Sequence, residues 1–203
     1  MKNTNHSLFD KYEMIKDLGT GSSGSVTLVR HISMDQERAL KKVPKASAFA
    51  ESALSEARLL KSLEHPSIPR IFDFEEDDAF YYIVEEYIDG ETLDSFLLHQ
   101  QLISPGLFFN ICEQLCNVFI YLHTQISTPI IYRDLKPEHI IVCHNKLKLI
   151  DFGVSAYVIQ DGNNFNRYGN IEFSAPECFT EDTITPAADI YSLGQLLQYI
   201  LTF

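Results

Sequence analysis

The chain has 203 residues, and 16 Lys and Arg against 28 Asp and Glu give it a formal net charge of −12. Hydrophobic residues make up 45% of the sequence and aromatic residues 12%, which favours a folded core over a disordered chain. The acidic balance disfavours a nucleic-acid partner, because proteins that bind phosphate backbones present basic surfaces. Length and composition therefore predict one or two globular units.

The sequence also carries information on location. The first 17 residues contain no apolar stretch of signal-peptide length, and no later run approaches the roughly 20 apolar residues of a membrane span. Cys112, Cys116, Cys143 and Cys178 lack the dense, regular spacing of a disulfide scaffold. We therefore expect a soluble, cytoplasmic protein with reduced thiols and no membrane span.

Residues 1–88 favour short strands separated by turns, several of them rich in Val, Ile, Tyr and Phe. The predicted strands are Tyr12–Leu18, Ser25–Arg30, Arg38–Val43, Ile71–Phe74 and Phe80–Glu86. Between the third and fourth strands, leucines and alanine recur at helical spacing, which predicts a helix over Glu51–Leu63. His65-Pro66 ends this segment.

Residues 89–203 have the period of helices. Ser104-Pro105 combines an N-cap with a proline at the first helical position, and apolar residues from Leu107 to Leu122 mark one face of a long helix. Two short strands (Ile140–Val142 and Leu147–Ile150), a polar loop over 153–172 and a helix opened by Thr185-Pro186 follow. The sequence predicts an α+β fold with a strand-rich lobe (1–88) and a helical lobe (89–203), and ligands often bind where two such units meet.

A glycine-rich segment, Gly19-Thr20-Gly21-Ser22-Ser23-Gly24-Ser25-Val26, lies between the first two predicted strands. Its G-x-G-x-x-G-x-V pattern suits a backbone that approaches phosphates closely, although a plain hairpin turn explains it equally well on its own. A dinucleotide-binding fold would need a helix directly after the glycines, where the sequence predicts a strand.

A lysine and a glutamate follow at useful places. Lys41 lies on the third predicted strand, and Lys42 points to the opposite face. Glu56 lies on the predicted helix, where its carboxylate can hold Lys41 in place, although a solvated helix charge is the commoner role of a lone glutamate.

Three further motifs occur in the second lobe: Tyr132-Arg133-Asp134-Leu135-Lys136-Pro137-Glu138-His139, Asp151-Phe152-Gly153 and Ala175-Pro176-Glu177. With the glycine segment, Lys41 and Glu56 they make the chain resemble the eukaryotic-type protein kinase family from about Tyr12 to Phe203, with every motif in family order. The resemblance implies a two-lobed kinase-like fold with a small antiparallel-sheet N-lobe. Lys136-Pro137 resembles serine/threonine kinases, and residues 84–93 resemble bacterial members of the family.

The resemblance also implies ATP and Mg²⁺ as cofactors and gives roles to single residues. Lys41 would bind the α- and β-phosphates, oriented by Glu56. Asp151 would hold Mg²⁺, Asp134 would accept or orient the proton of the substrate hydroxyl, and Lys136 would steady the γ-phosphate.

The same comparison implies a nucleotide site. The residues it assigns to the phosphates, the two ring faces and the adenine edge are Gly19, Gly21, Gly24, Val26, Ala39, Ile141, and the backbone of Glu86 and Ile88. Without the motifs around them, Val26, Ala39 and Ile141 would be ordinary core residues.

His139 departs from the family motif, which has Asn at this position to hold a second Mg²⁺ through oxygen. Imidazole nitrogen suits softer metals better. Three interpretations follow: a kinase that relies mainly on the Asp151 metal, a kinase with altered preference for Mn²⁺, or an impaired enzyme.

The leading function is an ATP-dependent protein serine/threonine kinase in signalling, and the alternative is a pseudokinase that binds nucleotide and partners without transferring phosphate. A small-molecule kinase is disfavoured by the Ala175-Pro176-Glu177 segment. Glu138 and the net charge favour basic protein substrates, although a solvated carboxylate is the commoner role for Glu138.

Measured against the family pattern, the chain is expected to lack the last helices of the large lobe. Apolar residues of the final helix would then be exposed and covered by a partner or a second copy: Ile190, Leu193, Leu196, Leu197, Ile200 and Leu201.

Overall fold

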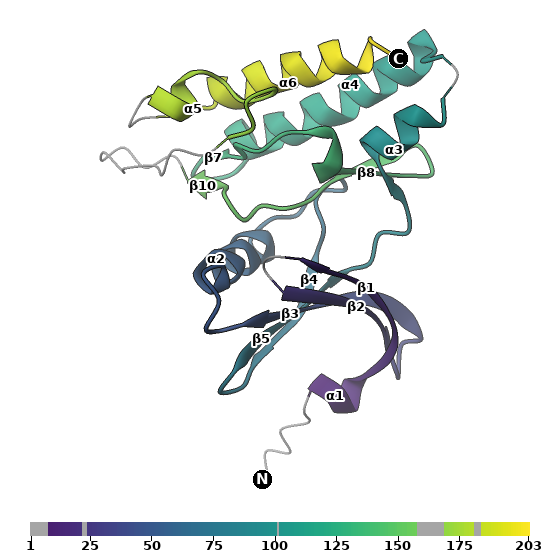
Figure 1. Cartoon of the computed structure of the whole chain (residues 1–203), viewed down its shortest axis with the longest axis vertical. Coiled ribbons are helices and arrows are strands. Elements are labelled where there is room, and N and C mark those ends of the chain that lie inside the picture. The colour runs from purple at the N-terminus through teal and green to yellow at the C-terminus, as the bar shows by residue number, and fades with distance from the viewer. Residues whose placement is uncertain (1–7, 22–23, 101, 158–168, 181–183) are drawn as a thin grey trace. The chain divides into compact units, whose positions relative to one another are not determined.

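The computed structural model describes residues 8–21, 24–100, 102–157, 169–180 and 184–203 (Figure 1). The chain forms two compact units: unit 1 comprises Met1–Leu63 and Pro69–Tyr87, and unit 2 comprises Glu64–Ile68 and Ile88–Phe203. The division predicted from the sequence, 1–88 and 89–203, differs from this one mainly at residues 64–68. The sequence placed them in the first unit, and the structure assigns them to the second.

Unit 1 is built around a five-stranded antiparallel sheet with the order β1-β2-β3-β5-β4. Its elements are α1 (Leu8–Lys11), β1 (Tyr12–Gly21), β2 (Gly24–His31), β3 (Gln36–Pro44), α2 (Ala50–Lys61), β4 (Ile71–Glu76) and β5 (Phe80–Glu86). All five predicted strands and the predicted helix are confirmed. The short helix α1 was not predicted, because four residues carry no helical period.

The two faces of this sheet bury different clusters, because side chains alternate along each strand. One cluster includes Leu40 and Val84. The other includes Val43 and Ile83 together with Ala53 and Ala57 of α2, so α2 covers this second face. Helix α2 exists because its alanines and leucines can bury one stripe against the sheet.

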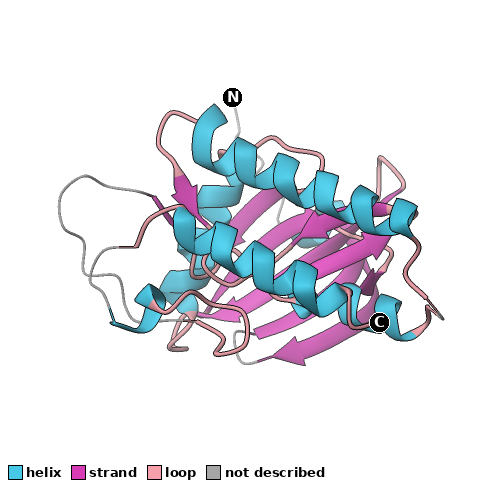
Figure 2. Ribbon diagram, turned by 90° about the horizontal axis from the view of Figure 1, so that it is seen from above, coloured by secondary structure: helices cyan, strands magenta, loops and turns pink. Residues whose placement is uncertain are grey.

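Unit 2 is mainly helical, and α4 and α6 run side by side (Figures 1 and 2). Its α-helices and strands are β6 (Glu91–Thr92), α3 (Leu93–Leu98), α4 (Pro105–Ile120), β7 (Ile130–Ile131), β8 (Ile140–Cys143), β9 (Lys146–Leu149), β10 (Ala156–Tyr157), α5 (Glu177–Thr180) and α6 (Ala187–Ile200). A π-helical turn, Tyr121–Gln125, continues α4. A 3-10 turn, Pro137–His139, precedes β8.

Local chemistry explains where these elements begin. The Ser104 side chain accepts a hydrogen bond from Leu107 N at 3.2 Å, so the N-cap predicted from the sequence is confirmed.

Strands β6, β8 and β9 form one small sheet, and β7 pairs with β10. The polar loop predicted over 153–172 is therefore partly wrong, because Ala156–Tyr157 forms a strand.

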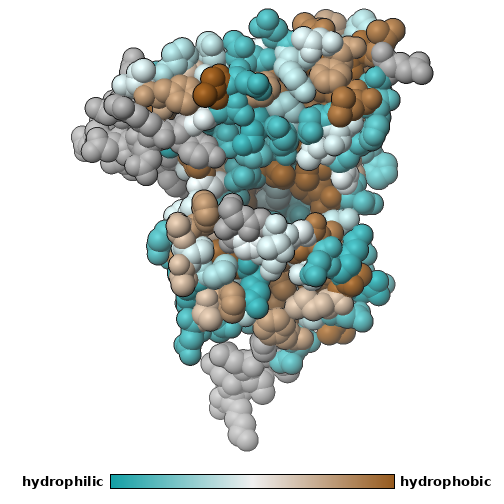
Figure 3. Space-filling model, in the orientation of Figure 1, coloured by the Kyte–Doolittle hydropathy of each residue, from teal (hydrophilic) through white to brown (hydrophobic). Residues whose placement is uncertain are grey.

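The apolar surface of α6 is smaller than the sequence predicts. Leu193, Leu196 and Ile200 are buried, because they face the rest of unit 2. Ile190 and Leu201 are 53% and 66% exposed. Figure 3 shows apolar side chains gathered at the end of unit 2 where the C-terminus lies. Among the described residues, no helix has both the length and the apolarity that crossing a bilayer requires.

The segment 64–68, which connects α2 to β4 in the sequence, is bound to unit 2 by hydrogen bonds. Glu64 N donates to the Tyr121 hydroxyl at 2.8 Å, and Leu149 N donates to Ser67 O at 2.8 Å. These contacts join residues far apart in the chain. They explain why the structure separates the segment from the strands and helix on either side of it.

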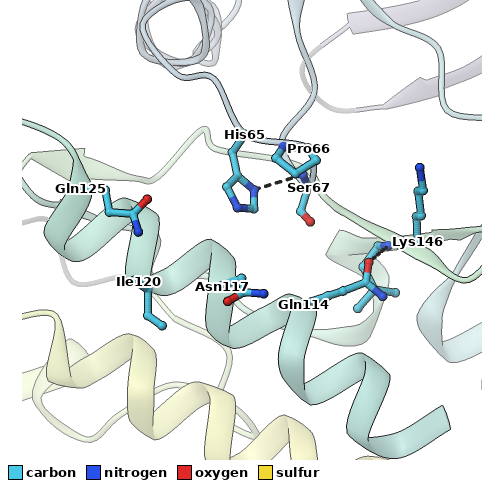
Figure 4. Close-up of a pocket in the computed structure, with 9 residues that line it drawn as sticks. His65, Pro66, Ser67, Gln114, Asn117, Ile120, Gln125 and Lys146 are labelled. Carbon is cyan, nitrogen blue, oxygen red and sulfur yellow. Dashed lines mark hydrogen bonds between the residues drawn. The ribbon is translucent and has the colours of Figure 1, made fainter. Parts of the chain in front are cut away.

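A hollow of about 430 Å³ lies between this segment, α4 and the start of β9 (Figure 4). His65 lines this hollow, and its ring packs on the ring of Tyr121, with centroids 5.1 Å apart. Gln114 closes another side, since its side chain accepts from Leu147 N at 2.8 Å and donates to Asn145 O at 2.9 Å. None of the residues predicted to bind nucleotide or metal lines this hollow.

Candidate functional site

In unit 1 the strand lysine and the helix glutamate form an ion pair. Lys41 Nζ lies 2.8 Å from Glu56 Oε2, and the two side chains are only 18% and 9% exposed. Lys42 points the other way, with Nζ 3.9 Å from the centroid of the Phe80 ring. The prediction that Lys41, and not Lys42, faces the helix is confirmed, and it follows from strand alternation.

The glycine segment is the hairpin between β1 and β2. Gly21 pairs with Gly24 and Gly19 pairs with Val26, which in turn pairs with Lys41 on β3. A Cβ atom on Gly24 would lie 2.1 Å from Lys42 O, and its φ is +147°, so no other residue fits. Ser22 and Ser23 lie outside the described residues. Gly24 lies against the strand that carries Lys41, so the hairpin and the phosphate loop weighed from the sequence are compatible.

The residues predicted to hold adenine are divided between the two units. In unit 1, Ala39 is buried and pairs with Glu85. The backbone N–H of the next residue, Glu86, donates to Arg70 O at 2.9 Å. In unit 2, Ile141 is half-buried on β8 and pairs with Thr92. Val26 is half-buried in unit 1, and Ile88 is half-buried in unit 2.

The segment of unit 2 that leads to Asp134 is anchored by a buried carboxylate. Asp189, on α6, is fully buried, and its oxygens accept from Tyr132 N and Arg133 N at 2.8 Å each. His123 Nε2, from the π-helical turn, lies 2.8 Å from Asp189 Oδ2. Arg133 has φ +75°, a left-handed conformation that is uncommon outside glycine. The backbone directly before Asp134 is therefore fixed by several independent bonds.

Asp134 and Lys136 are in contact within this segment. Lys136 Nζ lies 3.0 Å from Asp134 Oδ2, and Asp134 is only 3% exposed. A carboxylate accepts protons, and an ammonium group neutralises phosphate charge. The segment therefore places a proton acceptor beside a positive charge.

His139 connects Asp134 to Asp151. Its Nδ1 lies 3.0 Å from Asp134 O, and its Nε2 lies 3.3 Å from Asp151 Oδ2. Asp151 has φ +61°, and its Oδ1 accepts from Gly153 N at 3.4 Å. Phe152 is buried and packs edge-on against Tyr132, with ring centroids 5.0 Å apart.

These residues allow a direct test of whether the site suits Mg²⁺. The Asp151 carboxylate is 54% exposed and offers the oxygens that Mg²⁺ prefers. His139 offers nitrogen where a second Mg²⁺ would need oxygen, so it does not fit that ion. Among the described residues, no three His, Cys, Asp or Glu side chains are already arranged to hold a metal. The rest of any coordination shell would come from nucleotide and water.

Two features of the site were missed in the sequence. The His123–Asp189 contact depends on a π-helical turn, which no sequence pattern reveals. An acidic group was also missed: the charges of Asp94, Glu138 and Glu172 all raise the pKa of Tyr199. These carboxylates are far apart in the chain, and only Glu138 lies in a recognisable motif.

The order and geometry of these groups define a protein kinase domain. The model of the family described as "Protein kinase domain" matches residues 12–203, and the chain belongs to this family.

Three relatives show how the match extends. Serine/threonine-protein kinase PrkC of Bacillus subtilis is 31% identical over 95% of this chain and 30% of its own length. Serine/threonine-protein kinase ppk25 of Schizosaccharomyces pombe is 33% identical over 90% of this chain and 44% of its own. Serine/threonine-protein kinase PknB of Mycolicibacterium smegmatis is 30% identical over 96% of this chain and 33% of its own. The chain thus spans less than half the length of these relatives.

Proposed function

We propose that this chain is an ATP-dependent protein kinase that transfers the γ-phosphate to serine or threonine hydroxyls of protein substrates. One observation carries the proposal: Asp134 contacts Lys136 and His139, His139 contacts Asp151, and the backbone before Asp134 is anchored by the buried Asp189. Phosphoryl transfer depends chiefly on positioned charges of this kind. The names of the relatives and Lys136-Pro137 support serine and threonine as acceptors.

Each residue has a definite task in this reaction. The Asp134 carboxylate orients the substrate hydroxyl and takes its proton as the new oxygen–phosphorus bond forms and the bond to the leaving ADP oxygen breaks. Lys136 offsets charge on the γ-phosphoryl oxygens. Lys41, held by Glu56, binds the α- and β-phosphates, and the glycine hairpin presents backbone N–H groups to them. Asp151 would hold Mg²⁺, which would supply further charge neutralisation.

The remaining nucleotide residues would bind adenine. Val26 and Ala39 would cover one face of the ring and Ile141 the other, and backbone groups of Glu86 and Ile88 would bind its edge.

The Asp134→Asn variant tests the proposal. It keeps the side-chain shape and an oxygen that accepts from Lys136, but it removes the proton acceptor. We expect phosphate incorporation from radiolabelled ATP to fall by about 10²- to 10⁴-fold while nucleotide binding persists. Equal incorporation by wild type and variant would contradict the kinase activity and favour the alternative, a pseudokinase.

We also propose that the substrates carry basic side chains. Burial raises the pKa of Tyr199, and the negative charges of Asp94, Glu138 and Glu172 raise it further, so all three carboxylates act on this position. Tyr199 is itself held by Phe173, with ring centroids 5.7 Å apart. A Lys or Arg of a substrate peptide would be attracted to this acidic group.

Paired peptides that differ in one Lys or Arg near the acceptor test this preference. We expect Glu138→Gln to raise KM for the basic peptide about tenfold and to leave the neutral peptide unchanged. Glu113→Gln, an exposed glutamate on α4, is the matched control. The same ratio of KM values in wild type and Glu138→Gln would contradict the proposal.

The setting of this activity is also a proposal. Four free cysteines suit the reducing cytoplasm, where ATP is available. Ile190 and Leu201 are exposed enough to contact a partner or a second copy, and sedimentation at several concentrations would detect such self-association.

A further inference from the structure

The hollow beside segment 64–68 is lined by positive and neutral groups. Among the described residues that form its wall, Lys146 is a cation, His65 is an imidazole, and neither Asp nor Glu is present. The chain as a whole has a net charge of −12. The hollow therefore differs in charge from the chain that encloses it, and a ligand that brings negative charge fits it better than a cation.

The His65 ring supplies a fixed hydrogen-bond donor to this hollow. Ser67 N donates to His65 Nδ1 at 3.1 Å, so the ring proton lies on Nε2. The ring points from segment 64–68 toward α4, and its packing on Tyr121 holds it there (Figure 4). Within the described part of the chain, Nε2 has no acceptor. A ligand oxygen can therefore accept this N–H.

Side-chain amides follow one another along the opposite wall, on α4 and the π-helical turn. Gln114 uses both of its N–H groups, on Asn110 Oδ1 at 2.7 Å and on Asn145 O at 2.9 Å, and so belongs to the wall itself. Asn117 and Gln125 are exposed and make no hydrogen bond to another described residue. A side-chain amide has a donor and an acceptor, as a peptide group has, so these two can pair with an extended backbone.

The end of the hollow at β9 carries the positive charge. Lys146 is exposed, and Figure 4 shows it at the end opposite Gln125. Lys148 follows on the same face of the strand, and its Nζ lies 3.5 Å from Ile68 O. An acidic side chain at this end would meet two ammonium groups.

We propose that this hollow binds an extended segment of a partner protein, about five residues long, whose acidic side chain pairs with Lys146. Gln114 and Gln125 are 11 positions apart, about 16 Å along a helix, and five extended residues span the same length at about 3.3 Å each. Asn117, Gln125 and His65 Nε2 would bind the backbone of the segment. The inference goes beyond the proposed function, because it uses none of the residues assigned to phosphate transfer.

Selection from random seven-residue peptides displayed on phage tests the proposal, with the full chain as bait. We expect the enriched peptides to share Asp or Glu at one position, and Lys146→Glu to replace it by Lys or Arg. Lys16→Glu, exposed on β1, is the matched control and should select the same peptides as the wild type. Enrichment of the same peptides by all three baits, or no enrichment by the wild type, would overturn the proposal.

Fluorescence anisotropy then measures the ion pair with one enriched peptide and its counterpart, in which the acidic residue is replaced by its amide. We expect the counterpart to bind the wild type about fivefold more weakly, and both peptides to bind Lys146→Gln equally. The same loss in both chains would show that the acidic side chain does not meet Lys146. Free succinate that displaced the peptide at equal concentration would contradict an extended segment as the ligand.

NMR spectroscopy of the nitrogen-15-labelled wild type locates the peptide without relying on a variant. We expect the side-chain amide signals of Asn117 and Gln125 to shift when the peptide binds, and Asn117→Asp, which turns a donor into a negative charge, to weaken binding about tenfold. Binding that left both amide signals in place would overturn the proposal. None of these outcomes bears on phosphate transfer, which Asp134→Asn tests separately.

Discussion

Unit 1 and unit 2 hold their functional side chains by different means. In unit 1, Lys41 is held by the side chain of Glu56, and both groups are long and rotatable. In unit 2, Asp134 follows a backbone that the buried Asp189 binds through two N–H groups. Asp134 is therefore positioned by the core of unit 2. Lys41 is positioned by an ion pair that can separate while its sheet stays folded.

The largest effect should come from breaking the anchor of unit 2. Asp189→Ala leaves the buried N–H groups of Tyr132 and Arg133 without their carboxylate, so we expect the free energy of unfolding to fall by about 3–5 kcal/mol. Urea unfolding followed by tyrosine fluorescence measures this loss. Asp89→Ala, an exposed aspartate of the same unit, is the control. A change below about 1 kcal/mol would show that Asp189 is not the anchor.

A smaller effect, and one on activity rather than stability, should come from the pair in unit 1. Glu56→Gln keeps an oxygen that accepts from Lys41 but removes the charge that positions it. We expect kcat/KM for phosphate transfer to fall about 10²-fold, with less than about 1 kcal/mol change in the free energy of unfolding. Glu51→Gln, exposed in the first turn of the same helix, should leave both quantities unchanged. If Glu56→Gln lowered the free energy of unfolding as strongly as it lowered kcat/KM, the two units would not differ in how they hold their functional side chains.

The smallest effect should be a pH dependence in unit 2. Burial lowers the pKa of His65, and the charge of Lys148 lowers it further. The folded chain therefore favours the neutral ring, and below the ordinary histidine pKa of about 6.5 the unfolded chain binds more protons. The stabilisation from His65 is present above that pH and declines as the pH falls below it.

Urea unfolding at several pH values between about 5 and 8 measures this dependence. His65→Asn should flatten it, whereas His144→Asn should not. A steeper pH dependence in His65→Asn than in the wild type would contradict a lowered pKa at His65.

Much of the fold could be predicted because it depends on local patterns. Strand alternation placed Lys41 and Lys42 on opposite faces, and Ser104-Pro105 marked the start of α4. Short elements could not be predicted in this way. The six residues of α3 and the two of β7 are too few for a period, and their conformations depend on neighbours in unit 2.

The candidate site could likewise be predicted only in part. Its residue types could be identified from motifs, but the arrangement of His139 depends on geometry that motifs do not contain. The left-handed backbone at Asp151 and the 3-10 turn at Pro137–His139 bring the ring between two carboxylates. The acidic group at Tyr199 likewise depends on tertiary packing, because its members come from separate elements.

The membership of residues 64–68 in unit 2 has a consequence for how the chain is assembled. During synthesis this segment leaves the ribosome well before its partners, since Lys148 Nζ reaches Ile68 O across 80 residues. Strands β1–β5 can pair earlier from their own sequence, but the link from α2 to β4 is completed only when β9 arrives. A gene fragment that ends at Tyr87 would therefore encode every strand of the first sheet and still leave its internal connection without the hydrogen-bond partners that hold it.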